Sequence, residues 1–150
     1  MASRIHINWP GALYHVTDRG NERRAIFRDD QDRRRFLDYL GEAVKKYCLQ
    51  IHAFCLMPNH YHIEIETSQG NISHAMQWLK TTYTVNFNKR HRRVGHLFQG
   101  RFKAILVEKE NHLLELTLYI HLNPVRAGLA VLPEDYAWSS YPDYIRVRKR

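Results

Sequence analysis

The stretch "CLMPNHYHIEIET", residues 55–67, decides how this chain folds and where its chemistry lies. From Tyr61 onward apolar and polar side chains alternate, which is the two-residue period of a β-strand with one face against a core. His60 and His62 fall on the polar side, so their imidazoles point the same way and can share one metal ion or one phosphate. The alternative is a wet strand that includes two histidines by chance, and an isolated His-x-His pair favours it.

The neighbouring segments predict an order of elements around this strand. Residues 51–57 pair with it as a hairpin around Pro58-Asn59. Sequence patterns further predict strands over 12–17 and 101–108, and helices from Asp29 or Asp30 to about Tyr47, from Ile72 to about Lys89 behind a capping Asn71, and over 111–122. The last helix is expected to stop at Asn123 because Pro124 follows it.

This βαββαβ order with an extra helix is typical of the ferredoxin-like α+β fold, an antiparallel sheet with two helices on one face. We expect core stripes of Phe36, Leu37, Leu40 and Val44 on the first helix, and of Ile72, Ala75, Met76, Leu79, Tyr83 and Phe87 on the second. The other face of the sheet is expected to be open and to carry His60 and His62. Glu64, on that same face, is then either an extra ligand or merely solvated.

Length and composition predict one domain over residues 1–150, with a basic tail at 146–150 that is expected to be disordered. No apolar run approaches the roughly 20 residues that span a bilayer, and the first residues lack the apolar stretch of a signal peptide. We therefore expect a cytoplasmic protein with no membrane partner. Cys48 and Cys55 are then expected to be reduced core residues, since they lack zinc-site spacing.

The charge is strongly basic, with 23 Lys and Arg against 15 Asp and Glu, and indicates an anionic partner such as nucleic acid. Basic residues gather in 18–36, 88–103 and 146–150, although a run such as Arg33–Arg35 also suits the wet face of a helix. In the second cluster Phe98 and Phe102 alternate with cations, which suits a phosphodiester chain with bases stacked nearby. The candidate backbone contacts are Arg19, Arg23, Lys80, Arg92, Arg93, Arg101 and Lys103.

The last predicted helix adds a nucleophile to the two histidines. Glu115, Tyr119 and Asn123 are spaced four apart, so they share one helix face. Alone, Tyr119 would be an amphipathic residue at a core edge, but beside His-x-His and a basic groove it is a candidate nucleophile. A tyrosine oxygen can attack phosphorus to give a phosphotyrosine ester, which retains the bond energy and needs no ATP for rejoining.

Together "PGALYHVTDRGNERRAIF", "MPNHYHIEIET", "GHLFQGRFKAILVEKE", "YIHLNPVRAGL" and "WSSY" closely resemble the REP-associated tyrosine transposases. These belong to the HUH (His-hydrophobic-His) single-strand DNA endonucleases. The resemblance runs from about Pro10 to Tyr141. It implies that His60 and His62 are metal ligands, that Asn123 completes the metal site, and that Tyr119 is the nucleophile.

The resemblance also implies DNA that folds into hairpins, cut and rejoined in a transposition reaction through a 5′-phosphotyrosine intermediate. It implies Mg or Mn as the divalent metal, whereas two imidazoles by ligand type alone suit Zn, Ni or Cu. A domesticated protein that binds DNA hairpins or structured RNA without cutting stays an alternative, as does a replication-initiator or relaxase-type nuclease. We expect a monomer over a homodimer, because only about four residues separate the last strand from the tyrosine helix.

Overall fold

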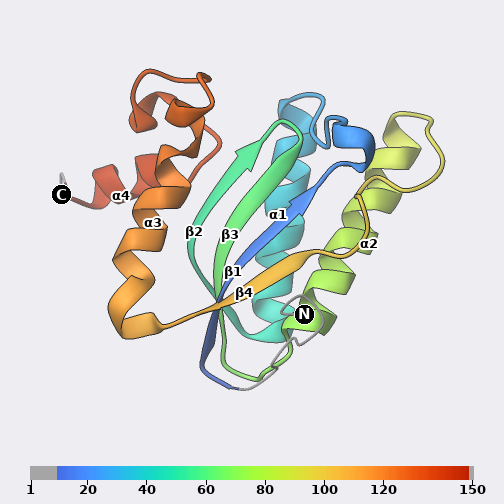
Figure 1. Cartoon of the computed structure of the whole chain (residues 1–150). Coiled ribbons are helices and arrows are strands. Elements are labelled where there is room, and N and C mark those ends of the chain that lie inside the picture. Colours follow the sequence, from blue (N-terminus) through green and yellow to red (C-terminus); the bar gives the residue numbers. More distant parts are fainter. Residues whose placement is uncertain (1–9, 149–150) are drawn as a thin grey trace.

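A computed structural model describes residues 10–148 of the chain, with the side chains of 109–111 and 145–148 left out, and shows the expected α+β fold (Figure 1). The four strands form one antiparallel sheet in the order β2-β3-β1-β4, so the hairpin strand β3 lies beside β1 as in ferredoxin-like folds. Along the chain the elements are β1 (Ala12–Arg19), η2 (Asn21–Arg23), α1 (Asp30–Tyr47), β2 (Leu49–Met57), β3 (His60–Thr67), α2 (Ile72–Arg90), β4 (Lys103–Val107), α3 (Lys109–Arg126), η3 (Pro133–Asp135) and α4 (Tyr141–Arg148). Residues 149 and 150 of the basic tail lie outside the described residues, and 146–148 form the end of α4.

Helices α1 and α2 cover one face of the sheet, and the main core lies between these helices and the strands (Figure 1). The predicted stripe of α2 is confirmed at all six positions, and on α1 Phe36 and Leu40 are buried while Leu37 and Val44 pack at the edge. Three rings form the centre, since the Phe36 ring lies 5.0 Å from that of Tyr61 and 5.2 Å from that of Tyr83. Aromatic burial of this size dominates the stability of a small domain.

The expectation that the opposite face of the sheet is open is wrong where α3 covers β2 and β3. Helix α3 packs over β2 and β3, and there a second cluster buries Ala53, Cys55, Met57 and Ile120. Glu64 is therefore neither solvated nor exposed to a ligand, because it is fully buried and accepts a 2.7 Å hydrogen bond from Thr117 of α3. On the same face the β4 side chains Lys103 and Ile105, which pair with Thr17 and His15 of β1, stay exposed.

Helix α3 does not stop before Pro124 but continues to Arg126, which corrects the predicted end. Proline removes one backbone donor inside a helix, and the side-chain amide of Asn123 lies near the carbonyls left there, with Nδ2 3.2 Å from the Tyr119 oxygen and 3.5 Å from that of Ile120. Gly128, two residues after the end of the helix, has a φ of 75°, which suits the left-handed position of a Schellman motif. The Leu129 amide donates to the Pro124 carbonyl at 2.8 Å to close that motif.

The end of α1 corrects a second expectation. Cys48 is exposed rather than buried, because it adopts the left-handed conformation that ends α1 and turns the chain into β2. Cys55 is buried as expected. Both are free thiols, and no disulfide constrains the site.

The segment after α3 joins the edge of the sheet. The Ser140 amide donates to the Phe54 carbonyl and the Leu56 amide to that of Trp138, so residues 138–140 lie along β2. The Ser140 hydroxyl also lies 2.7 Å from Nε2 of buried His121, which ties α3 to this segment. Within residues 10–148 no helix has the length and apolar character needed to cross a bilayer.

Candidate active site

A cavity of about 460 Å³ lies beside α3, on the face of the sheet that carries His60 and His62. Strands β1, β3 and β4 form its floor, and α3 forms one wall. Its lining residues are Thr17, Asp18, Arg19, His60, His62, Gln99, Arg101, Lys103, Tyr119 and Asn123. The structure thus brings the four residues expected to carry chemistry, namely the histidine pair, the tyrosine and the asparagine, to one cavity.

The two histidines share the sheet face that lines this cavity, because they are two residues apart on β3. Their ring centroids are 5.1 Å apart. Each ring is held by a hydrogen bond at its Nδ1 atom. Nδ1 of His60 lies 2.8 Å from Oδ1 of Asn59, and Nδ1 of His62 lies 2.9 Å from Nε2 of His15. Holding one nitrogen orients the other, so Nε2 is the atom that each ring offers to a ligand.

Burial lowers the pKa of His60, and it lowers that of His62 to about 3, with the charges of His15, His60 and Arg126 acting in the same direction. Both imidazoles are therefore neutral at pH 7. Neutral imidazole is the form that binds a metal ion, since protonation removes the lone pair.

Tyr119 stands on the α3 wall with 45% of its surface exposed, so a substrate can reach its hydroxyl. Its ring meets those of His62 and His15 edge-on, each at 6.1 Å between centroids. Asn123 follows one turn later and lines the same cavity. Glu115, which was predicted to share this helix face, instead lines a second hollow together with His112. Tyr119 lines both this hollow and the cavity.

The seven candidate DNA contacts divide by location. Arg19, Arg101 and Lys103 line the cavity and are exposed. Lys80 forms a 2.8 Å ion pair with buried Asp18 and donates to the Gly100 carbonyl, which gives it a structural role. Arg93 likewise makes local hydrogen bonds, donating to Oδ1 of Asn88 in α2 and to the carbonyl of His96.

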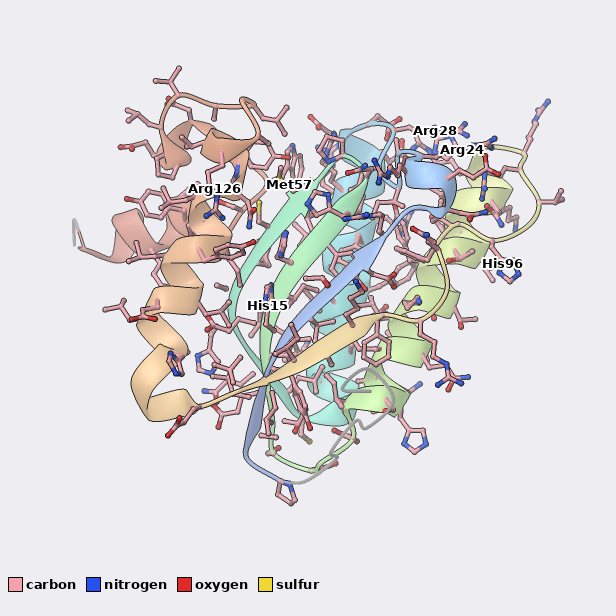
Figure 2. All side chains as sticks on the ribbon, viewed as in Figure 1. His15, Arg24, Arg28, Met57, His96 and Arg126 are labelled. Carbon is pink, nitrogen blue, oxygen red and sulfur yellow. The ribbon has the colours of Figure 1, made fainter. Side chains whose placement is uncertain are left out.

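The remaining two, Arg23 at the end of η2 and Arg92 after α2, are exposed and do not line the cavity. Figure 2 shows Arg24, Arg28 and His96 gathered at one end of the molecule. The stacking role suggested for Phe98 and Phe102 is wrong, because both rings are buried in the main core. The segment between α2 and β4, residues 91–102, therefore exposes basic side chains to a nucleic acid but not the rings of Phe98 and Phe102.

Several contributors were missed by sequence reasoning. His15 and Thr17 reach the site face from β1, and the alternation of Leu13, His15 and Thr17 was a signal for this. Arg126 places its guanidinium over the Tyr119 ring, with Cζ 4.1 Å from the centroid. Figure 2 shows His15 on β1 and Arg126 on α3, both on the side of the sheet that α3 covers. Only the spacing of seven residues from Tyr119 indicated Arg126.

The donor set fits a divalent cation that is bound partly by substrate and water. Among the residues that the structure describes, no three His, Cys, Asp or Glu side chains converge on a point. The protein atoms on offer are thus two imidazole nitrogens and the Asn123 amide oxygen, which leaves ligand positions for phosphate oxygens. Such an incomplete set is typical of a catalytic rather than a structural metal site.

Helix α3 thus brings a tyrosine beside a histidine pair on an antiparallel sheet, which is the arrangement that the resemblance to tyrosine transposases implies. The sequence profile of the family described as "Transposase IS200 like" matches residues 10–123, and this chain belongs to that family. It is 26% identical over 149 residues to a Haemophilus influenzae protein assigned to the REP-associated tyrosine transposases, covering 87% of this chain and 80% of the relative. The family expected from the sequence is confirmed.

Two solved structures share the fold. One is a REP-associated tyrosine transposase bound to a REP hairpin, with a TM-score of 0.74 at 17% identity, covering 91% of this chain and 79% of the other. The second is a Deinococcus radiodurans protein assigned as a transposase, with a TM-score of 0.54 at 18% identity, covering 75% of this chain and 90% of the other.

Proposed function

We propose that this transposase is a metal-dependent single-strand DNA endonuclease and strand transferase that cuts and rejoins DNA beside a hairpin. One observation carries the proposal: the Tyr119 ring borders the same cavity as His60, His62 and three exposed cations. A nucleophile, a metal-binding pair and a phosphate-binding surface therefore meet where a single strand can enter.

Tyr119 supplies the attacking oxygen. A bond forms between the phenol oxygen and phosphorus, and the bond from phosphorus to the 3′ oxygen of the preceding nucleotide breaks. The phenol proton passes to solvent through the exposed side of the cavity, and the released 3′ oxygen takes up a proton to become a hydroxyl. Attack by a 3′ hydroxyl on the phosphotyrosine ester reverses these steps and rejoins DNA.

His60, His62 and Asn123 would hold the cation, as Mg or Mn by family resemblance. When bound, the cation would polarise the scissile phosphate and stabilise the leaving oxygen. Removal by EDTA, or either His60→Ala or His62→Ala, should abolish cleavage and leave hairpin binding largely intact. Asn123→Ala should have a milder effect, since water can replace a neutral amide. Restoring activity with single metals after EDTA treatment would identify the ion.

The partner that fits this surface is hairpin DNA with a single-stranded flank. Arg19, Arg101 and Lys103 are placed to contact the phosphates of the strand that enters the cavity. The structural relative that is bound to a REP hairpin supports this class of partner. Arg23 in η2 and Arg92 after α2 are our candidates for contacts with the duplex stem.

The test is Tyr119→Phe, which removes one oxygen. With hairpin DNA and Mg or Mn, the wild-type protein should become joined to the 5′ phosphate of one fragment, seen as a shift on a denaturing gel. The variant should bind the same DNA with unchanged affinity and form neither adduct nor cut product.

The matched control is Tyr39→Phe, which removes a tyrosine hydroxyl on the other face of the sheet, where the ring packs against Trp78. It should form the adduct at the wild-type rate. Cleavage by Tyr119→Phe without an adduct would make water the nucleophile and contradict the proposal. Binding without cleavage by the wild-type protein would favour the domesticated hairpin-binding alternative.

A further inference from the structure

Arg126 contacts the nucleophile and the residue one turn after it at the same time. Its guanidinium lies over the face of the Tyr119 ring, with Cζ 4.1 Å from the ring centroid. Its Nη2 lies 3.0 Å from the backbone carbonyl of Tyr119 and 3.3 Å from Oδ1 of Asn123. One exposed cation thus joins the Tyr119 ring, the Tyr119 carbonyl and the Asn123 amide oxygen.

The helix explains why these groups meet. Arg126 follows Tyr119 by seven residues and Asn123 by three, so all three lie on one face of α3. Pro124 lacks the N–H that would donate to the Ile120 carbonyl, and Nδ2 of Asn123 lies 3.5 Å from that oxygen. Asn123 and Arg126 both donate to the Tyr119 carbonyl. A cation in the last turn is also favoured by the helix dipole.

The contacts restrict both side chains that line the cavity. Stacking a planar guanidinium on the ring limits rotation of the Tyr119 side chain about its χ angles. Because Nδ2 of Asn123 faces back along the helix, its oxygen is the atom turned toward Arg126 and outward. Lysine at this position could place a charge near the ring, but its ammonium cannot lie flat on the ring as a planar guanidinium does while also donating to both oxygens.

We propose that Arg126 is a positioning residue of the transesterification, holding the Tyr119 ring and the Asn123 amide in their reactive orientation. This rests on the proposed function, in which Tyr119 is the nucleophile. It assigns Arg126 to the chemical step, in contrast to the cavity cations, which hold the DNA backbone.

The first measurement is the rate of adduct formation at saturating hairpin DNA, beside the dissociation constant. Arg126→Ala and Arg126→Gln should each slow adduct formation by roughly tenfold or more, the loss expected when a reacting group is misplaced. The dissociation constant should change no more than in Arg35→Ala, which removes one exposed arginine from α1. Arg126→Lys should stay slow although it keeps the charge.

Chemical rescue separates positioning from a general structural loss. Because Arg126 is exposed, guanidinium ion added to Arg126→Ala should restore part of the rate, whereas ammonium at the same ionic strength should not. A wild-type rate in Arg126→Ala, full activity in Arg126→Lys or equal rescue by both ions would overturn the proposal.

A readout without DNA or metal tests the contact itself. Ring currents from Tyr119 should shift the Arg126 side-chain NMR resonances upfield, and Tyr119→Leu should return them to ordinary values. Unshifted resonances in the wild-type protein would overturn the inference while leaving the proposed function standing. Failure of the wild-type protein to form any adduct would instead overturn the proposed function and, with it, this inference.

Discussion

His15 shows how a single residue outside the paired histidines sets the geometry of the site. It lies on β1, opposite Glu64 of β3, and its Nε2 holds Nδ1 of His62 at 2.9 Å. Metal-binding histidines ordinarily use a carboxylate, carbonyl or water for this purpose. Here a second imidazole does so, and burial lowers its pKa, which keeps it a neutral partner at pH 7.

Buried His121 predicts how stability depends on pH. Burial lowers its pKa to about 4, whereas an exposed histidine in the unfolded chain titrates near 6.5. Between these values the unfolded chain binds more protons, so the free energy of unfolding should fall as pH decreases from 6.5 toward 4. The contribution is up to about 1.4 kcal/mol per pH unit.

His121→Gln can keep a hydrogen bond to Ser140 but cannot titrate, so it should reduce this slope. The measurement is urea unfolding at several pH values between 4 and 7, with the two proteins compared at each. His62, with a pKa lowered to about 3, contributes to the slope in both proteins with the same sign. Identical slopes for the two proteins would contradict the assignment of His121.

At the scale of elements, a hydrogen bond helps to hold α3 against the sheet. The Thr117 hydroxyl, two residues before Tyr119, donates to Oε1 of fully buried Glu64 at 2.7 Å and also lies 2.8 Å from the Leu113 carbonyl. Burial raises the pKa of Glu64, although the Thr117 hydrogen bond and the charge of His52 oppose the rise. Among the described residues, Oε2 has no hydrogen-bond partner, so the carboxyl depends on this one donor.

Thr117→Val keeps the shape of the side chain and removes the donor. It should lower the free energy of unfolding by about 1–3 kcal/mol, the cost of leaving a buried polar atom unpaired. Thr117→Ser, which keeps the hydroxyl, is the control and should lose much less. Calorimetry measures both, and equal losses would show that methyl packing rather than the hydrogen bond secures α3.

The elements also show what could be predicted from sequence. Helical spacing on α2 predicted its buried positions, and alternation on β3 predicted that Tyr61, Ile63 and Ile65 face the main core. Burial along β3 does not itself alternate, because His62 and Glu64 on its other face are also buried. The end of α3 could not be read in this way, since the helix continues through Pro124, where the side chain of Asn123 approaches the Ile120 carbonyl that the proline leaves without its backbone donor. Local rules fail where a long-range or side-chain contact supplies what the backbone lacks.

The site itself was predictable only in part. His60, His62, Tyr119 and Asn123 stand in separated motifs whose order matches a family, and the cavity brings them together. Phe98 and Phe102 carried the same local signal as a stacking surface, yet they are buried because the loop folds back on the core. Lys80 is an ion-pair partner for the same reason, since only the fold places it beside Asp18.

At the scale of the whole molecule, net charge predicts binding that weakens with salt. Replacing Arg101 and Lys103 together by Ala should reduce affinity for all hairpins alike. It should also lower the slope of log affinity against log salt by about 1.4, since each single-strand phosphate contact contributes about 0.7. Fluorescence anisotropy over a salt series measures both quantities.

The control replaces Arg34 and Arg35 by Ala, which removes the same charge from the exposed side of α1. It should leave the salt slope nearly unchanged. A loss confined to one DNA sequence in the Arg101 and Lys103 variant would show that these residues read bases rather than phosphates.

The two cores on opposite faces of the sheet differ greatly in size, and this has a consequence for local unfolding. Among the described residues the cluster between α3 and the sheet has four fully buried side chains, far fewer than the main core on the other face. Amide hydrogens of α3 should therefore exchange with solvent faster than those of β1 and β3. On warming, cutting should be lost at a lower temperature than hairpin binding, because Tyr119, the proposed nucleophile, departs with α3 while Arg19, Arg101 and Lys103 stay in place.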